Sequence, residues 1–201
     1  MTIGKKIIIV DDSNISRLFL KSVFEENSFQ VVGQFSSCTE LKSSIMKIEH
    51  DYICLDYFLG DGTGVEAYMS IKQYCPKSKY MFVTSRLELS NLIEMYELGT
   101  CGIAYKENAS SIKNMIVAGQ EGGHYYDHLI ANKILQFNLE SKPLTKNEKM
   151  TFVKLMSGKS IQDLAEELSV NDRTIWRRRN EIINKLGRAT FDRYCTHKIA
   201  I

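Results

Sequence analysis

Short apolar runs alternate with amphipathic stretches from residue 5 to about residue 120. The apolar runs lie near residues 5–10, 29–35, 51–56, 79–84 and 102–105. In the stretches between them, Ser37-x-x-Glu40 and Thr63-x-x-Glu66 fit the capping box that starts a helix. Strands that alternate with helices in this way form a parallel sheet with helices on both faces. We therefore predict a doubly wound α/β domain with five parallel strands.

Helical periodicity continues after the last apolar run. One helix is predicted from about Ala109 to Gly119, and a linker helix from Asp127 to Asn138. Pro143 indicates a hinge, because proline disfavours helical backbone in the residue before it. The predicted organisation is a first domain over 1–120, a linker with a helix over 121–143 and a second domain over 144–201.

The second domain shows helical periodicity alone. Thr145-x-x-Glu148 is a third capping box, and Ser160-x-x-Asp163 starts another short helix. Ser169-Val170-Asn171 forms a tight turn, after which a longer helix ends at Gly187. Two helices joined by such a turn form a helix-turn-helix, whose second helix enters the major groove of DNA. We therefore predict a small all-α DNA-binding domain.

The second helix of this motif has a core face and a basic face. At 100° per residue, Ile175, Ile182 and Leu186 share a narrow sector and face the core. The stems of Arg178 and Arg179 lie nearer the core edge, with their heads toward phosphates. A solvated basic face is the alternative, and four arginines around an outward tryptophan argue against it. The predicted DNA contacts are Arg173, Thr174, Trp176, Arg177, Arg178, Arg179, Asn180, Asn184 and Lys185.

Three carboxylates follow apolar runs of the first domain. Asp11 and Asp12 end the run Ile7–Val10, and Asp56 ends the run Tyr52–Leu55. Since the carboxyl ends of parallel strands meet at one edge of the sheet, these charges gather there and repel one another unless a cation lies among them. Mg²⁺ binds through one or two carboxylates plus phosphate oxygens. Thr84 and Lys106 end two further strands and supply a donor and a positive charge for a phosphoryl group.

Charge is divided unevenly along the chain. Residues 1–143 hold 14 Lys and Arg against 17 Asp and Glu, whereas residues 144–201 hold 12 against 7. A basic second part behind an acidic first part indicates that only the second part meets nucleic acid.

Composition narrows the class of protein further. Hydrophobic residues make up 44% of the chain, enough for a packed core. No run approaches the ~20 apolar residues of a membrane span, and the N-terminus shows no signal-peptide pattern. The five cysteines are scattered and form no CxxC pair, which argues against a zinc site or a disulfide framework. We expect reduced thiols and a cytoplasmic protein without a membrane partner.

These motifs resemble a known family. The pair Asp11-Asp12 with Asp56, Thr84 and Lys106 matches the signature of CheY-like receiver domains in order. Leu144-Thr145, Gly158-Lys159-Ser160, Leu164-Ala165, Thr174-Ile175 and Lys185-Leu186-Gly187 match the LuxR-type helix-turn-helix. The whole chain is similar to NarL/FixJ-type two-component response regulators, which implies flavodoxin-like strand order in the first domain.

The resemblance implies a role for each signature residue. Asp56 is the phosphoryl acceptor, and Thr84 and Lys106 contact the phosphoryl group or the acceptor carboxylate. Asp11, Asp12 and Asp56 hold Mg²⁺ together with the backbone carbonyl of Phe58. The phosphoryl donor is a sensor histidine kinase or a small acyl phosphate. The resemblance implies that the protein is a homodimeric, DNA-binding transcription factor that reads operator half-sites. It also implies that the protein is not an enzyme, apart from slow self-dephosphorylation.

Four positions depart from the family pattern. Gly60 replaces a usual proline, so we expect a more mobile loop after the acceptor. Ile103 replaces the switch aromatic three residues before Lys106, and we expect the neighbouring Tyr105 on the other face of its strand. Trp176 and Arg178 replace a common lysine and histidine of the recognition helix, which bears on operator sequence.

Two alternatives stay open beside the phosphorylation-switched regulator. One is a DNA-binding regulator that works without phosphorylation and uses the receiver as a dimerisation scaffold. The three aspartates with Thr84 and Lys106 argue against it, while Ile103 keeps it open. The other is a phosphatase with an aspartyl nucleophile. Such enzymes usually carry a second aspartate two residues after the nucleophile, where this chain has Phe58.

Overall fold

The computed structural model describes residues 4–85 and 87–195. The outer ends of the two predicted domains, residues 1–3 and 196–201, and Arg86 lie outside the described residues. The chain forms two compact units, one from residues 1–87 and 95–130 and the other from residues 88–94 and 131–201. Within the described residues, no helix has the length and apolar character needed to cross a membrane.

The first unit is built on a parallel sheet with the order β2-β1-β3-β6-β7-β8. Within the described residues, this sheet has six strands rather than the predicted five. The first five strands have the flavodoxin-like order. The strands are β1 (Lys5–Val10), β2 (Phe29–Phe35), β3 (Tyr52–Leu55), β6 (Lys79–Thr84), β7 (Gly102–Tyr105) and β8 (Tyr125–Tyr126).

The sixth strand depends on a glycine in its neighbour. β8 pairs with β7 through Gly102↔Tyr125 and Ile103↔Tyr126. A Cβ atom on Gly102 would lie 2.1 Å from the carbonyl oxygen of Tyr125, so any larger residue would push β8 away. Two residues are too few to show strand periodicity, which is why the sequence pattern did not reveal this strand.

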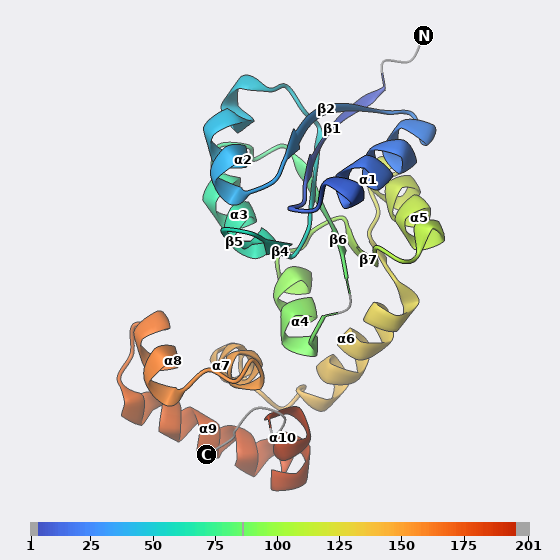
Figure 1. The fold of residues 1–201 in the computed structure, drawn as a ribbon. Helices are drawn as coiled ribbons and strands as arrows, with labels where there is room; N and C mark the ends of the chain where they lie inside the picture. Colours follow the sequence, from blue (N-terminus) through green and yellow to red (C-terminus); the bar gives the residue numbers. More distant parts are fainter. Residues whose placement is uncertain (1–3, 86, 196–201) are drawn as a thin grey trace. The chain divides into compact units, whose positions relative to one another are not determined.

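Helices cover both faces of the sheet, as predicted. α1 (Asn14–Glu26) and α5 (Ala109–Gln120) lie on one face, and α2 (Cys38–Ser44) and α3 (Gly64–Ile71) on the other (Figure 1). The core under α1 and α5 includes Phe24, Tyr52 and Ile116, all nearly inaccessible to solvent. Thr63 and Glu66 form the predicted capping box of α3, whereas Ser37 caps α2 alone and Glu40 bonds to Ser36.

The remaining elements that the structure describes before the helix-turn-helix are two helices, a 3-10 turn and a hairpin. A 3-10 turn over Ile45–Lys47 follows α2, and strands β4 (Phe58–Leu59) and β5 (Gly62–Thr63) form a small hairpin. α4 covers Leu89–Glu97 and α6 covers His128–Glu140, two residues longer than the predicted linker helix at its C-terminal end.

The second unit contains the predicted helix-turn-helix. α7 (Lys146–Met156), α8 (Ile161–Glu167) and α9 (Asp172–Leu186) begin at Thr145, Ser160 and Asn171, whose side chains cap them. Gly187 ends α9 with a φ of 81°, a left-handed conformation that favours glycine. A further helix, α10 (Arg188–Cys195), follows, which the sequence pattern did not predict.

An aromatic stack joins three helices of the second unit. The ring of Phe152 in α7 lies 5.8 Å from Phe137 in α6 and 5.7 Å from Phe191 in α10, both in stacked geometry. Tyr194 meets Phe137 and Phe152 edge-on. Because aromatic pairs add to the energy of apolar burial, this stack anchors α6 and α10 to the helix-turn-helix.

A buried carboxylate fixes α9 to α7. Glu148 accepts hydrogen bonds from Lys185 Nζ at 2.7 Å and from the backbone N–H of Thr145 at 2.6 Å. Burial alone would raise the pKa of Glu148, but these hydrogen bonds and the Lys185 ammonium outweigh it and lower the pKa below its ordinary value. The stabilisation by the ionised carboxylate is therefore complete above the ordinary pKa and is lost as pH falls through the lowered one.

We predict that Glu148→Gln lowers the free energy of unfolding at pH 7 by about 1–3 kcal/mol, because one partner of a buried hydrogen-bonded ion pair is lost. Its stability should also fall less steeply than that of wild type as pH drops below 5. Urea unfolding of the full chain at several pH values measures both effects. Glu166→Gln, an exposed change in the same unit, is the control. Equal acid sensitivity of Glu148→Gln and wild type would contradict the assignment.

Candidate functional site

Four neighbouring strands bring the predicted residues to one edge of the sheet. Val10 and Leu55, the last residues of β1 and β3, pair with each other, and β6 continues from Phe82, the partner of Leu55, to Thr84 at the same edge of the sheet. β7 lies beside β6, with Tyr105 opposite Thr84. The residues that follow or end these strands therefore meet, although they are far apart in the sequence.

Lys106 is the centre of this cluster. Its Nζ lies 2.6 Å from Asp11 Oδ2 and 2.6 Å from Asp56 Oδ2. Asp11 is fully buried, and Asp56 is 6% exposed. Burial lowers the pKa of the Lys106 ammonium, but its contacts with the two carboxylates outweigh that effect and raise the pKa overall. One cation is thus shared by two buried anions, so the group keeps an excess negative charge.

Asp11 is held from several sides. Its Oδ1 accepts a hydrogen bond from the backbone N–H of Ser13 at 2.9 Å, and Arg17 Nη1 donates to its carbonyl oxygen at 2.7 Å. Burial raises the pKa of Asp11, although the Lys106 ammonium opposes the shift. A further cation beside this buried carboxylate would offset the cost of its burial.

The three aspartates are close enough to share one cation. One ligand oxygen from each of Asp11, Asp12 and Asp56 lies within 4.8 Å of the others. Asp11 and Asp56 are buried and Asp12 is exposed, so the group opens toward solvent on the Asp12 side. An all-oxygen set of this kind suits Mg²⁺, which keeps several waters and binds few carboxylates. The residues present therefore fit the metal predicted from the sequence.

Thr84 contributes a buried hydroxyl to this edge. Thr84 is 0% exposed, and its Oγ1 has no hydrogen-bond partner among the described residues. An unsatisfied buried hydroxyl costs about 1–3 kcal/mol, so its retention indicates a partner that arrives with a ligand. A phosphoryl oxygen on the adjacent Asp56 would be such a partner.

The segment after Asp56 is a hairpin fixed by Asp61. The Asp61 carboxylate accepts hydrogen bonds from the backbone N–H groups of Cys38 and Thr39 at 2.8 and 2.9 Å. These bonds, with one from the Thr39 hydroxyl, lower the pKa of Asp61 to about 2. Sequence reasoning missed this clamp, although Gly60-Asp61 is a two-residue hairpin signal. Gly60, where we expect a mobile loop, lies in the turn of this hairpin.

Two further residues shape the acceptor loop. A Cβ atom on Gly64 would lie 2.1 Å from the carbonyl oxygen of Asp56, so only glycine allows this approach. Phe58, whose carbonyl is a predicted metal ligand, lies in β4 with its side chain 58% exposed and edge-on to Tyr57. Asp56 Oδ1 accepts a hydrogen bond from the backbone N–H of Tyr57 at 2.7 Å.

The prediction for Tyr105 was wrong. Ala104 points into the core under α1 and α5, so Ile103 and Tyr105 both point to the opposite face of β7. Side chains two residues apart in a strand share a face. Tyr105 is 6% exposed and pairs in register with Thr84. The chain therefore carries an aromatic residue on the same face as Ile103, next to the strand end that bears Thr84.

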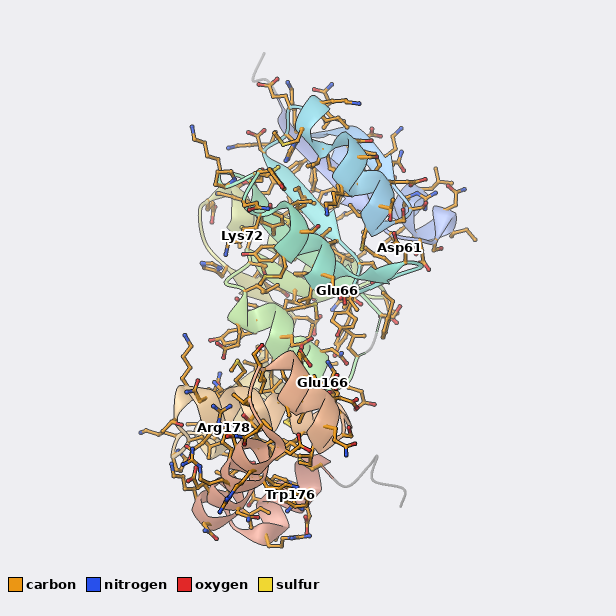
Figure 2. The ribbon with its side chains drawn as sticks, turned by 90° about the vertical axis from the view of Figure 1, so that its left-hand side faces the viewer. Asp61, Glu66, Lys72, Glu166, Trp176 and Arg178 are labelled. Carbon is orange, nitrogen blue, oxygen red and sulfur yellow. The ribbon has the colours of Figure 1, made fainter. Side chains whose placement is uncertain are left out.

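The second candidate site is the outer face of α9. Arg173, Trp176, Arg177, Asn180 and Asn184 are exposed, while Ile175 and Ile182 are buried, as the helical periodicity predicted. Figure 2 shows Trp176 and Arg178 among the side chains of the second unit, and Trp176 is 51% exposed. The helix thus presents cationic, amide and aromatic groups on one side.

Several predicted DNA contacts also have partners inside the unit, and Arg177 Nε lies 3.9 Å from Glu181 Oε1. Thr174 donates from its backbone N–H and its hydroxyl to the Asn171 cap. Lys185 is bonded to Glu148, and Arg178 Nη1 donates to Thr151 Oγ1 at 3.4 Å. Arg179 lies over the ring of Trp176. These side chains have structural contacts, which the sequence had indicated for Arg178 and Arg179 alone.

Comparison with known proteins identifies the first unit. The response regulator receiver domain family matches residues 7–117. Transcriptional regulatory protein YdfI of Bacillus subtilis (strain 168) is 26% identical over 191 residues, which cover 90% of this chain and 89% of that protein. Transcriptional regulatory protein LiaR of the same strain is 23% identical over 190 residues, with 90% of each chain covered.

Solved structures agree in fold along nearly the whole chain. RcsB from Salmonella enterica serovar Typhimurium, bound to promoter rprA in the presence of the phosphomimetic BeF3-, has a TM-score of 0.67 at 20% identity, with 96% of this chain and 98% of that chain covered. A structure of two RcsB dimers bound to two parallel DNAs has a TM-score of 0.66 at 20% identity, with the same shares covered.

The receiver match covers more than half of the chain, and it contains the Asp56 and Lys106 site. A helix-turn-helix unit follows it. The chain therefore belongs to the response regulator family, and its two-domain arrangement is that of the NarL/FixJ type.

Proposed function

We propose that this protein is a transcription factor whose binding to DNA is switched by phosphorylation of Asp56. The observation that carries the proposal is the position of Lys106, 2.6 Å from both Asp11 and Asp56, beside the buried and unsatisfied hydroxyl of Thr84. Such an arrangement provides an anionic nucleophile and two donors for a transferred phosphoryl group.

The reaction is a phosphoryl transfer to a carboxylate oxygen of Asp56. This oxygen attacks phosphorus, and the bond from phosphorus to the donor breaks; its electron pair leaves with the imidazole of a sensor histidine kinase or with the carboxylate of a small acyl phosphate. Lys106 and Thr84 stabilise the phosphoryl oxygens. Asp11, Asp12, Asp56 and the Phe58 carbonyl would hold Mg²⁺, which would supply neutralisation of the charge on the phosphoryl group. Such chemistry depends on positioning and electrostatics.

The site supports a phosphoacceptor rather than a phosphatase. Aspartyl phosphatases usually carry an aspartate as general acid two residues after the nucleophile, and this position holds Phe58, whose side chain cannot transfer a proton. We therefore expect slow hydrolysis of the phosphoaspartate.

The second unit delivers the response to DNA. Its relatives include RcsB, whose structures were solved on promoter DNA and as dimers. α9 of this chain enters the major groove, and a homodimer reads two half-sites about one helical turn apart. Arg173, Arg177 and Asn180 are exposed polar side chains in the N-terminal part of α9 and contact base edges or phosphates. Five free cysteines accord with a cytoplasmic location.

We predict that Asp56→Asn abolishes labelling by acetyl phosphate, because the amide cannot act as the acceptor nucleophile. The fold should persist, since amide and carboxylate have nearly the same shape. Phosphate-affinity gels with Mg²⁺ measure the labelling, and EDTA should remove it from wild type. Asp51→Asn, at the opposite end of β3, should label normally. Undiminished labelling of Asp56→Asn would rule out this residue as the acceptor.

A second prediction concerns α9. Arg177→Ala or Asn180→Ala should weaken binding to a specific operator by about 1–3 kcal/mol if the side chain reads a base edge. Binding of the full chain should also fall steeply with salt, because cationic side chains displace condensed counterions. Fluorescence anisotropy on operator and random duplexes measures both effects. Equal losses on both duplexes would make the residue a phosphate contact.

A third prediction concerns coupling between the two sites. Beryllofluoride, a phosphoryl mimic, should promote dimerisation and raise operator affinity by roughly tenfold, or ~1.4 kcal/mol, within the usual range of coupling energies. The effect is modest because buried Ile103 offers no hydroxyl at the usual switch position. Sedimentation and DNA titration under matched conditions measure the two responses. If neither responds, a regulator that works without phosphorylation replaces the switched one.

A further inference from the structure

Trp176 is the single tryptophan of the chain, and it lies on the outer face of the recognition helix. Half of its surface, 51%, is exposed to solvent. Its helical neighbours Arg173 and Asn180, three residues before and four residues after, are also exposed. A large apolar ring therefore stands among polar groups that suit DNA.

Arg179 holds this ring in place. The Arg179 guanidinium carbon lies 5.4 Å from the centre of the Trp176 ring and 5.2 Å from the centre of the Phe191 ring. Both distances fall within the roughly 6 Å of a cation–π contact. Phe191 is 2% exposed and stacks on Phe152 in the core. The indole is thus linked, through one guanidinium, to the aromatic core of the unit.

The chemistry of the indole limits what it can recognise. Its only hydrogen-bonding group is a single N–H donor, and the rest of its surface is apolar. In the major groove, the apolar group presented by a base pair is the C5 methyl of thymine. Residues in the N-terminal part of a recognition helix contact base edges, and Trp176 is the fifth residue of α9.

We propose that Trp176 reads thymine through its C5 methyl group and that Arg179 is the residue that positions it. The proposal rests on the proposed binding of α9 to DNA. It predicts that each operator half-site contains a thymine whose methyl group packs on the indole of Trp176. Exposed Arg173 and Arg177 on the same side of α9 favour a polyanionic partner over an apolar protein surface.

Replacement of thymine by deoxyuridine tests this directly, because it removes the methyl group and keeps the hydrogen-bonding edge. We expect full-length wild type to bind a footprinted operator about fourfold more weakly for each contacted methyl that is lost, the value of one buried methylene. Trp176→Ala should bind the thymine operator more weakly and should show no difference between thymine and deoxyuridine duplexes. Tryptophan emission, which reports Trp176 alone, should change on binding and change less with deoxyuridine.

Three further variants distinguish a loss of thymine recognition from a loss of folded structure. Trp176→Phe keeps an aromatic ring and should retain part of the thymine preference. Arg179→Lys keeps the charge but loses the planar group that stacks, so the preference should shrink and tryptophan emission of the free protein should shift. Met150→Ala, an exposed apolar change in α7, should keep the full preference. Circular dichroism establishes that each variant is folded.

The outcomes distinguish this inference from the proposed function. Binding of wild type to the operator with equal affinity for thymine and deoxyuridine duplexes overturns the role of Trp176 and leaves DNA binding intact. The same preference in folded Trp176→Ala as in wild type overturns it too. An undiminished preference in folded Arg179→Lys overturns the positioning role. Failure of wild type to bind either duplex overturns both proposals.

Discussion

The pairing of one ammonium with two buried carboxylates organises the first unit. Lys106 contacts Asp11 and Asp56 at 2.6 Å each, and these three residues follow three different strands. Buried charges are stable only when they are paired, so the pairing requires the C-terminal ends of β1, β3 and β7 to lie at the same edge of the sheet. Parallel strands with matched register meet this requirement. The sheet therefore places the groups of the site, and the site in turn constrains the sheet edge.

The same edge has capacity left for a ligand. Asp12 is exposed beside two buried aspartates, and the Thr84 hydroxyl has no partner within the described residues. The excess negative charge of the aspartates suits a cation, and the Thr84 hydroxyl can donate to a phosphoryl oxygen. The hairpin after Asp56 is clamped by Asp61 onto the start of α2, so the acceptor sits on a supported loop. Preorganised groups of this kind favour transfer without large rearrangement.

The second unit uses its charged residues in two ways. Lys185 and Arg178 bond to Glu148 and Thr151 and hold α9 on α7. Arg173 and Arg177 remain exposed. Arg179 belongs to both groups, since it touches the core ring of Phe191 and the exposed ring of Trp176. A basic recognition helix is thus partly a structural element, and the loss of an arginine there need not mean a lost contact with DNA.

The sequence by itself determined the elements that are long enough to show a regular pattern of apolar residues. The five main strands, the capped starts of α7, α8 and α9, and the buried side of α9 follow from local periodicity and cap chemistry. It also determined that Asp11, Asp56 and Lys106 share a sheet edge, because strand ends in a parallel sheet converge. Tertiary structure alone decided β8, which exists because Gly102 lets a second backbone approach, and the partners of Lys185 and Arg179. A two-residue strand is too short to show the alternation of apolar and polar residues. The tertiary partner of a side chain cannot be predicted from neighbouring residues. Both therefore depend on packing between segments that are distant in the sequence.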